Sequence, residues 1–329
     1  MKNRIFLNPN PGTVNAVYSG LFERLDCEPG FFKKEDVLAD PERFHGVTEI
    51  FSTWGMPHFT EEEIARCFPN LKCVYYGAGS VQGFAREFLQ SGVRVFSAWA
   101  ANAVPVAEFT VAEIVLCMKG FFHTVRQYSS GDLAGSGANR SRSIGNYDYK
   151  VGILGAGMVG REVIRLLKNY ECEILVFDPF LSDDKAAALG VKKASLDDIF
   201  ASCEVVSNHL ANNAQTRGML RGAHFEKMMQ NCFFINTGRG AQIVESEMTD
   251  VLAARPDLTA FLDVTDPEPP VAGSPLYTLP NVVMTPHIAG SLGREVKRMG
   301  VYMVEEAERV AAGEPAKWEV SLEMLKTMA

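Results

Sequence analysis

Three glycines, spaced as Gly155-x-Gly157-x-x-Gly160, constrain the fold of this chain more than any other feature. They follow the apolar run Val151–Leu154 and precede a stretch whose apolar residues recur at helical spacing. In this setting Gly155 permits a tight turn, Gly157 lets a pyrophosphate approach the backbone, and Gly160 lets the helix pack on its strand. The first N–H groups of the helix would meet the phosphates, so the motif predicts a dinucleotide-binding βαβ unit.

The motif belongs to the second of two blocks in which short apolar runs alternate with amphipathic stretches, a pattern typical of βαβ units and parallel sheets. The first block is expected to form strands at Arg4–Leu7, Glu49–Phe51, Cys73–Tyr76 and Arg94–Phe96, with helices such as Glu61–Cys67 and Val81–Leu89. The second is expected to form the six strands of a full dinucleotide-binding sheet, at Val151–Leu154, Glu173–Phe177, Val205–Asn208, Cys232–Asn236, Ala260–Val264 and Val282–Met284.

Between the blocks lies Val104–Tyr128, a mostly apolar helical stretch that ends in the Gly- and Ser-rich segment Ser129–Ser143 and is expected to carry the chain between domains. The last helical stretch, Ser291–Ala312, has no expected strand after it and should pack back on the first domain. At 329 residues the chain exceeds what one core usually serves. We therefore predict an α/β protein of two doubly wound parallel-sheet domains, a Rossmann domain (103–291) and a discontinuous flavodoxin-like substrate domain (1–102 and 292–329).

The acidic residue Asp178 comes eighteen positions after Gly160, at the end of the next expected strand. A carboxylate there can accept hydrogen bonds from the adenosine ribose hydroxyls and would repel a 2′-phosphate. Pro179 and Phe180 follow it, so no Arg or Lys is present to neutralise that phosphate. The cofactor expected is therefore NAD rather than NADP. The alternative is an ordinary glycine-rich turn with a surface aspartate.

Four further motifs follow the glycines in a definite order. They are Val176-Phe-Asp178, Asn236-Thr-Gly-Arg239-Gly240, Asp263-Val-Thr-Asp-Pro-Glu268-Pro269 and Thr285-Pro-His287-Ile-Ala-Gly290. Each alone is weak. In this order and spacing the chain resembles the D-isomer-specific 2-hydroxyacid dehydrogenases, which move a hydride between NAD(P) and C2 of a small 2-hydroxy or 2-keto acid.

The resemblance implies three catalytic residues, Arg239, Glu268 and His287. An arginine can hold carboxylate and carbonyl oxygens with its planar fork, a geometry that lysine lacks. A histidine can deliver a proton to the developing alkoxide and remove it in the reverse direction. A glutamate on the other ring nitrogen would set the tautomer and favour the imidazolium. The alternatives without a catalytic role are that Arg239 forms a surface salt bridge, that Glu268 is a turn carboxylate and that His287 is a structural loop histidine.

The cofactor-binding residues expected from the motifs and the resemblance are Gly155, Gly157, Met158, Val159, Gly160, Asp178, Pro179, His209, Thr216, Thr237, Gly238, Asp263 and Gly290. Ala211 stands where the family has proline after the His209 position, which should loosen that turn. Asp263 matches the family aspartate that holds the carboxamide, although it could instead cap a turn.

The substrate-binding residues expected are Trp54, Ala78, Gly79, Ser80, Arg239 and His287. The loop Tyr75–Val81 resembles the family's glycine-rich loop, whose backbone N–H groups bind the substrate carboxylate, although Val81 stands where many members have Asp. Neither this loop nor Ser52–Pro57 contains Lys or Arg, which disfavours a phosphorylated substrate such as 3-phosphoglycerate. Trp54 and Met56 suggest a neutral, partly apolar substrate side chain.

The leading hypothesis is thus an NAD-dependent D-2-hydroxyacid dehydrogenase that reduces 2-keto acids. One alternative is a non-catalytic NAD(H)-sensing protein on the same fold, because fold does not determine function. Another is a formate- or phosphite-oxidising relative. The resemblance also implies a homodimer formed through the apolar stretch Val104–Tyr128.

Composition excludes several other classes of function. A net charge of -8 and a pI near 5.4, with dispersed basic residues, offer no footprint for nucleic acid. No window approaches the ~20 apolar residues that a membrane span needs, so we expect no membrane partner. The first residues include no apolar stretch of signal-peptide length, so we expect a cytosolic location. The seven cysteines are scattered and form no C-x-x-C pair, so neither a disulfide framework nor a metal site is expected.

Overall fold

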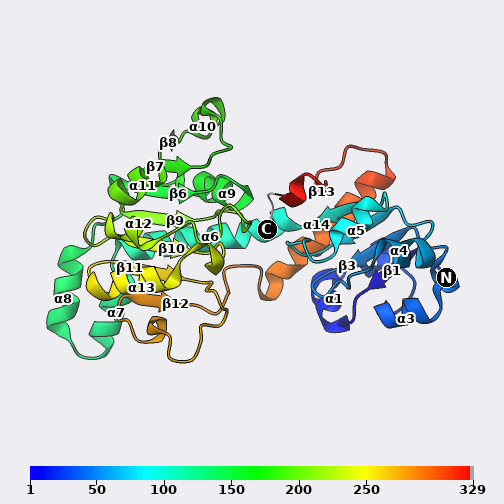
Figure 1. Cartoon of the computed structure of the whole chain (residues 1–329), viewed down its shortest axis with the longest axis horizontal. Helices are drawn as coiled ribbons and strands as arrows, with labels where there is room; N and C mark the ends of the chain where they lie inside the picture. The colour runs from blue at the N-terminus through cyan, green and yellow to red at the C-terminus, as the bar shows by residue number, and fades with distance from the viewer. Residues whose placement is uncertain (327–329) are drawn as a thin grey trace. The chain divides into compact units, whose positions relative to one another are not determined.

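The computed structural model describes residues 1–326 and divides the chain into two compact units (Figure 1). Unit 1 comprises Met1–Asn102 and Ser291–Ala329, and unit 2 comprises Ala103–Gly290. Unit 2 ends at Gly290, one residue earlier than the end at residue 291 predicted from the sequence. Each unit has its own sheet and its own buried core, which confirms the predicted class of two parallel-sheet α/β domains.

The sheet of unit 1 has the strand order β13-β5-β4-β3-β1-β2 and is parallel except for β13, which runs antiparallel to β5. Its strands are β1 (Arg4–Leu7), β2 (Phe31–Phe32), β3 (Glu49–Ser52), β4 (Cys73–Tyr76), β5 (Arg94–Ser97) and β13 (Glu319–Val320). The prediction that no strand follows the last helix was wrong. Buried Glu306 accepts hydrogen bonds from the N–H groups of Lys317 and Trp318 (2.6 and 3.0 Å), and this leads the chain back to the free edge of β5.

The helices of unit 1 pack on its sheet and include the last long helix of the chain. They are α1 (Pro11–Tyr18), α2 (Phe22–Leu25), α3 (Lys34–Ala39), α4 (Glu61–Cys67), α5 (Ala85–Gln90) and α14 (Val296–Ala311). Helix α5 begins at Ala85, later than the predicted Val81. Gly300 lets α14 lie directly against α1, because a Cβ there would be 2.2 Å from the Val17 carbonyl oxygen. The last helix therefore belongs with the first part of the chain.

The sheet of unit 2 is parallel throughout, with the order β12-β11-β10-β9-β6-β7-β8. Its strands are β6 (Tyr149–Leu154), β7 (Cys172–Phe177), β8 (Lys192–Lys193), β9 (Val205–Asn208), β10 (Phe233–Asn236), β11 (Thr259–Leu262) and β12 (Val282–Met284). All six predicted strands are present. The edge strand β8 was not predicted, since it consists of two exposed lysines and has no apolar residue.

Ten helical segments belong to unit 2 or enter it. They are α6 (Trp99–Met118), α7 (Phe121–Ser129), α8 (Leu133–Arg142), α9 (Met158–Leu167), α10 (Asp183–Leu189), α11 (Leu196–Ser202), α12 (Gly222–Glu226), α13 (Glu245–Ala254), and the short 3-10 helices η2 (Gly240–Gln242) and η3 (Pro275–Tyr277). The chain passes from unit 1 to unit 2 in the first turn of α6.

Val104–Tyr128 is not the single helix that the sequence predicted, because Gly120 adopts φ +60° and separates α6 from α7. Its first part, α6, leads the chain from unit 1 into unit 2, as expected. The Gly- and Ser-rich segment that follows contains α8, which lies beside α7 within unit 2 (Figure 1). The Asp132 carboxylate caps α8 by accepting from the Gly135 N–H (2.8 Å), and Asn139 hydrogen-bonds Gln127 of α7. Packing thus overrides a composition that is poor in helix formers.

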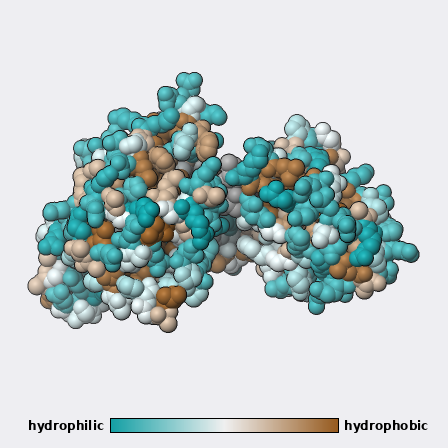
Figure 2. All heavy atoms as spheres, viewed as in Figure 1, coloured by the Kyte–Doolittle hydropathy of each residue, from teal (hydrophilic) through white to brown (hydrophobic). Residues whose placement is uncertain are grey.

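Helix α6 also corrects the expectation that no segment is apolar enough for a membrane. Among residues 1–326 it is the one helix whose length and composition would allow it to cross a membrane. Most of it is buried in the protein, however, and Ile114, Cys117 and Met118 are fully enclosed by the core. Core helices commonly pass the same test. The face drawn in Figure 2 is mainly hydrophilic, with small scattered hydrophobic groups.

Candidate active site

The cofactor-binding and catalytic residues predicted in unit 2 all follow its strands, either in the loops or, for Met158, Val159 and Gly160, in the first turn of α9. Because the strands are parallel, their carboxyl ends lie at one edge of the sheet. The chain leaves β6 for β7 on one side and returns to β9 on the other, so the strand order reverses beside β6. Open α/β sheets bind ligands at this kind of reversal.

The glycine-rich loop after β6 has the geometry that a pyrophosphate requires. Gly155 adopts φ +93°, and a Cβ there would lie 2.8 Å from the His209 carbonyl oxygen. Gly160 packs so tightly that its Cβ would be 2.0 Å from the Gly155 oxygen. By contrast, a Cβ at Gly157 would have no heavy atom within 4 Å, so space is open where α9 begins at Met158 and Val159. The first N–H groups of that ten-residue helix have no intrahelical acceptor and suit an anion.

The Asp178 carboxylate supports this loop from the end of β7. Its Oδ2 accepts from the Ala156 N–H (2.7 Å), and its Oδ1 accepts from the Phe180 N–H (2.8 Å). Each carboxylate oxygen retains a further lone pair for a ribose hydroxyl. The chain continues through exposed Pro179, so the structure adds no cation beside the carboxylate within this turn.

The position of Asp178 predicts a coenzyme preference. The unmodified protein should use NADH with a much higher kcat/KM than NADPH, because the carboxylate would accept from the ribose hydroxyls and would repel a 2′-phosphate. Asp178→Ala should narrow this gap, mainly by weakening NADH binding. Initial rates with both coenzymes at saturating keto acid measure it. Equal efficiency with the two coenzymes in the unmodified protein would contradict the assignment.

His209 and Thr216, after β9, have largely structural contacts. His209 is buried, its Nε2 lies 2.9 Å from Ser207 Oγ, and burial lowers its pKa to about 3, so its ring is neutral. The Thr216 hydroxyl donates to the Ala211 oxygen (2.5 Å) and accepts from the Asn213 N–H (3.1 Å). These bonds close the turn in which Ala211 replaces the family proline.

Arg239 follows β10 and is held mainly by its backbone. Its Nη1 donates to the carbonyl of Gly238 (2.7 Å), and its own carbonyl accepts from Asn236 Nδ2 (3.1 Å). Burial lowers the pKa of Arg239, and the charge of Glu268 opposes that effect. Gly240 explains why these two residues are neighbours. A Cβ at Gly240 would lie 2.0 Å from the Thr265 carbonyl carbon, so only glycine lets the Arg239 loop contact the segment leading to Glu268.

Thr237 and Asp263 use their side chains within the protein. Thr237 Oγ1 lies 2.9 Å from Thr110 Oγ1 of α6. Asp263 Oδ1 accepts from the Thr285 hydroxyl (2.6 Å) and the Ile288 N–H (2.7 Å), and Oδ2 accepts from the Ala289 N–H (3.0 Å). Asp263 therefore organises the whole loop from Thr285 to Gly290. One lone pair of Oδ2 remains for a carboxamide.

His287 lies at the centre of that loop in an unusual backbone conformation. Its φ is +54°, in the left-handed region that costs a residue with a side chain roughly 1–2 kcal/mol. Its N–H donates to the Asp263 carbonyl (3.0 Å), so Asp263 bonds the loop with both carboxylate and backbone. The ring Nδ1 and Glu268 Oε1 are 2.6 Å apart, with both side chains about half exposed. One imidazole nitrogen is thereby engaged, and Nε2 remains for a ligand.

The substrate-binding residues predicted in unit 1 form two well-anchored loops. The Asn8 amide donates to the carbonyls of Thr53 and Trp54 (3.1 and 3.0 Å), and Trp54 is 41% exposed. Ser97 Oγ donates to the carbonyls of Ala78 and Gly79 (2.9 and 2.6 Å), and Ser80 is exposed. With these carbonyls bound inward, the loop suits the use of its N–H groups for a carboxylate.

Sequence reasoning missed Glu113, a carboxyl in the middle of α6. It is 3% exposed, and neither carboxylate oxygen has a hydrogen-bond partner within residues 1–326. Burial raises its pKa to about 9, with a further contribution from the charge of Asp263, so the group is protonated at neutral pH. The surrounding apolar pattern gave no signal of this, because the pattern marks α6 only as a core helix.

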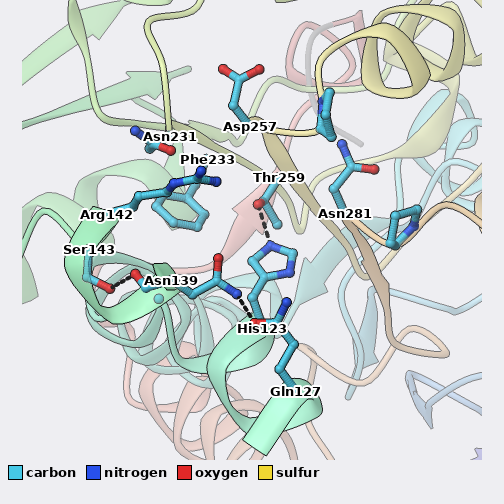
Figure 3. A pocket seen from close by; sticks show the side chains of 13 residues that line it. His123, Gln127, Asn139, Arg142, Ser143, Asn231, Phe233, Asp257, Thr259 and Asn281 are labelled. Carbon is cyan, nitrogen blue, oxygen red and sulfur yellow. Dashed lines mark hydrogen bonds between the residues drawn. The ribbon is translucent and has the colours of Figure 1, made fainter. Parts of the chain in front are cut away.

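A cavity of about 250 Å³ lies at the amino ends of β10, β11 and β12, opposite the edge that carries Arg239 and His287 (Figure 3). His123 of α7 enters it and places Nε2 2.7 Å from Thr259 Oγ1. The lining mixes Arg142, Asp257 and several amides. It contains none of the residues predicted to bind cofactor or substrate.

Comparison with known proteins supports the reading of the motifs. The family model described as "D-isomer specific 2-hydroxyacid dehydrogenase, NAD binding domain" matches residues 111–289. The D-3-phosphoglycerate dehydrogenase of Archaeoglobus fulgidus is 29% identical over 263 residues, covering 80% of this chain and 49% of that protein. The chain thus spans about half the length of the curated relatives it matches.

Solved structures show the same fold at low identity. The apo D-mandelate dehydrogenase of Rhodotorula graminis has a TM-score of 0.79 and 19% identity, with 98% of both chains covered. A phosphoglycerate oxidoreductase from Rhizobium etli has a TM-score of 0.80 and 20% identity, with 96% of this chain and 97% of that chain covered. This chain belongs to the D-isomer-specific 2-hydroxyacid dehydrogenase family, as its motifs predicted, and its unit 2 is an NAD-binding domain.

Proposed function

We propose that this protein is an NAD-dependent D-2-hydroxyacid dehydrogenase that works as a 2-keto acid reductase. The observation that carries the proposal is the 2.6 Å hydrogen bond between His287 Nδ1 and Glu268 Oε1, at the same sheet edge as Arg239. The glycine loop and Asp178 fit NADH, which when bound supplies the hydride that reduces C2. Arg239 holds the carboxylate and carbonyl oxygens of the keto acid.

The proton moves through His287. With Nδ1 bound to Glu268, the ring presents Nε2–H to the oxygen that becomes an alkoxide, and Nε2 accepts the proton when a hydroxy acid is oxidised. Asp263 keeps the ring in place by bonding Thr285 before it and Ile288 after it in the loop. Glu268 compensates the positive charge of the imidazolium. A protein that only senses NAD(H) would need neither this pair nor a cation beside it, so we favour the enzyme over the sensor.

The proposed substrate has a neutral, partly apolar side chain. The similar proteins include both a phosphoglycerate dehydrogenase and a mandelate dehydrogenase, so the comparison does not select one substrate. The loops Ser52–Pro57 and Tyr75–Val81 carry no Lys or Arg to bind a phosphate. Trp54 instead offers an exposed aromatic surface.

An NADH-oxidation screen tests the function and the substrate class together. Pyruvate, glyoxylate, hydroxypyruvate, phenylpyruvate and longer keto acids are compared with a phosphorylated 2-keto acid and, in the oxidative direction with NAD, with formate and phosphite. We expect the highest kcat/KM for an unphosphorylated keto acid. Turnover of formate or phosphite alone would favour the oxidising relative, and no turnover despite NADH binding would favour the sensor.

The His–Glu pair makes a prediction about kcat. Glu268→Gln removes the carboxylate that lies 2.6 Å from His287 Nδ1 and should lower kcat for keto-acid reduction, because an amide cannot form the charge-assisted hydrogen bond that orients the ring. The measurement is steady-state kinetics of variant and parent. Glu247→Gln, which removes an exposed partner of Arg221, is the matched control and should leave kcat unchanged. An unchanged kcat in Glu268→Gln would remove the pair from the mechanism.

We also propose a homodimer and a cytosolic location. The dimer was expected to form through the stretch Val104–Tyr128, and exposed apolar side chains lie on α7 at the end of this stretch and on the segment that follows it. Large exposed side chains there are Phe121, Val125, Tyr128, Leu133, Ile144 and Tyr147. A second copy of the chain would cover this face, and its burial would be favourable. Light scattering at micromolar concentration should give twice the monomer mass, and a monomer would contradict the proposal.

A further inference from the structure

Three fully buried side-chain amides lie together directly beneath the Arg239 loop. Asn208 ends β9, Asn236 ends β10, and Gln242 belongs to η2. Asn208 Nδ2 donates to Asn236 Oδ1 (2.9 Å) and to Gln242 Oε1 (2.5 Å). These residues, called here the amide triad, connect the ends of two neighbouring strands to the turn that carries Arg239.

The triad admits only one arrangement of its hydrogen bonds. Both protons of Asn208 Nδ2 are donated within it, and Asn208 Oδ1 accepts from the Leu210 N–H (3.3 Å). Gln242 Oε1 accepts from Asn208 and from the Arg239 N–H (3.4 Å), while Gln242 Nε2 donates to the Leu210 carbonyl (2.6 Å). Turning the Gln242 amide around would set donor against donor at Asn208. The orientation of each amide is thereby determined by its neighbours.

The groups that the triad binds are the backbone atoms around the predicted carboxylate anchor. Asn236 accepts from the Gly238 N–H (3.1 Å) and donates to the Arg239 carbonyl (3.1 Å), and Gln242 binds the Arg239 N–H. The contact is close, since a Cβ at Gly238 would lie within 3.1–3.2 Å of Asn208 and Gln242 atoms. Through Leu210 the triad also holds the loop that follows His209. The substrate-anchoring loop and a cofactor-side loop are therefore bonded to one buried cluster.

We propose that Asn208 and Gln242 are positioning residues, which set the Gly238–Arg239 backbone and thereby the affinity of the site for the substrate carboxylate. This inference rests on the proposed function. The triad accepts from the Gly238 and Arg239 N–H groups and so satisfies buried backbone donors, which contributes to stability. A satisfied amide cluster also imposes one geometry on the backbone that it binds.

Gln242→Leu tests the proposal, since it keeps the volume and removes the bonds to Arg239, Asn208 and Leu210. We expect KM for the best keto acid to rise about 10- to 100-fold, as a displaced anchor predicts, with kcat changed less than about threefold. The inhibition constant of oxamate, a carboxylate analogue of pyruvate, should rise by the same factor. The dissociation constant of NADH, from its fluorescence, should change less than about threefold.

A buried amide at the other edge of the same sheet gives the matched control. Asn281 is 2% exposed and donates to the carbonyls of Leu252, Arg255 and Leu258. Asn281→Leu should lower Tm as Gln242→Leu does, yet leave KM and oxamate binding unchanged. Gln242→Glu, which at low pH is a neutral acid with one acceptor and one donor, should restore KM toward the parent value in acid and lose this rescue as pH rises.

Two results would overturn the proposal. The first is equal effects of Gln242→Leu and Asn281→Leu on KM, which would make the triad merely structural. The second is unchanged hydrogen exchange of the 236–242 backbone amides in Gln242→Leu, which would show that the triad does not hold the loop. The exchange measurement needs no turnover, so it decides the positioning claim even if the unmodified protein reduces no keto acid. That latter outcome would count against the proposed function alone.

Discussion

Replacing His287 with alanine is expected to lower kcat for keto-acid reduction by roughly 10²–10⁴-fold, the contribution of a positioned acid–base group. The ring Nδ1 lies 2.6 Å from Glu268 Oε1. Removing the ring leaves no titratable side chain between Thr285 and Gly290 that could deliver a proton. NADH binding should remain largely intact, because the glycine loop and Asp178 lie on other strands of the sheet. Steady-state kinetics and NADH fluorescence titration measure the two quantities separately.

The backbone at His287 calls for a second variant. Its φ of +54° disfavours alanine, whereas asparagine adopts this region more readily. His287→Asn therefore removes the imidazole with less disturbance of the loop that Asp263 organises. Both variants should lose kcat to a similar extent. A large loss in His287→Ala with near-parental activity in His287→Asn would assign the effect to loop conformation and exclude the ring as the acid–base group.

Replacing Arg239 with methionine should lower kcat/KM for the keto acid by roughly 10²–10³-fold, as expected when one partner of a desolvated charge pair is truncated. Arg239→Lys should recover only part of this, because an ammonium cannot bind two oxygens with a planar fork. The Arg239 side chain bonds to the protein through the Gly238 carbonyl, and burial already disfavours its charge. A bound carboxylate would thus meet a guanidinium that is partly stripped of water.

A surface arginine in the same unit is the control for this pair. Arg221 forms an exposed ion pair with Glu247, and Arg221→Met should change kcat/KM by less than about twofold. Unfolding curves for all three variants establish that lost activity is not lost structure. Parental kcat/KM in Arg239→Met would show that the substrate carboxylate is bound elsewhere.

The sequence predicted the central strands well for a physical reason. Strands buried on both faces tend to be apolar runs, as Val151–Leu154 of β6 and Phe233–Ile235 of β10 show. The shortest edge strands, β8 and β13, leave no such trace. The strands β8 and β13 are two residues each and form because the edges of β7 and β5 offer free backbone groups. Helix α8 likewise depends on its contact with α7, against a composition rich in Gly and Ser.

For the site, the sequence by itself determined which residue types stand at the ends of which strands, because motif spacing and parallel strands together place them at one edge. It could not determine the conformation that makes them useful. Three features of the site depend on segments that are distant along the chain: the left-handed backbone of His287, the close approach at Gly240 and the amide triad under Arg239. They arise only when packing brings these segments together and leaves their buried polar groups no water to bind. Tertiary structure alone therefore decided them.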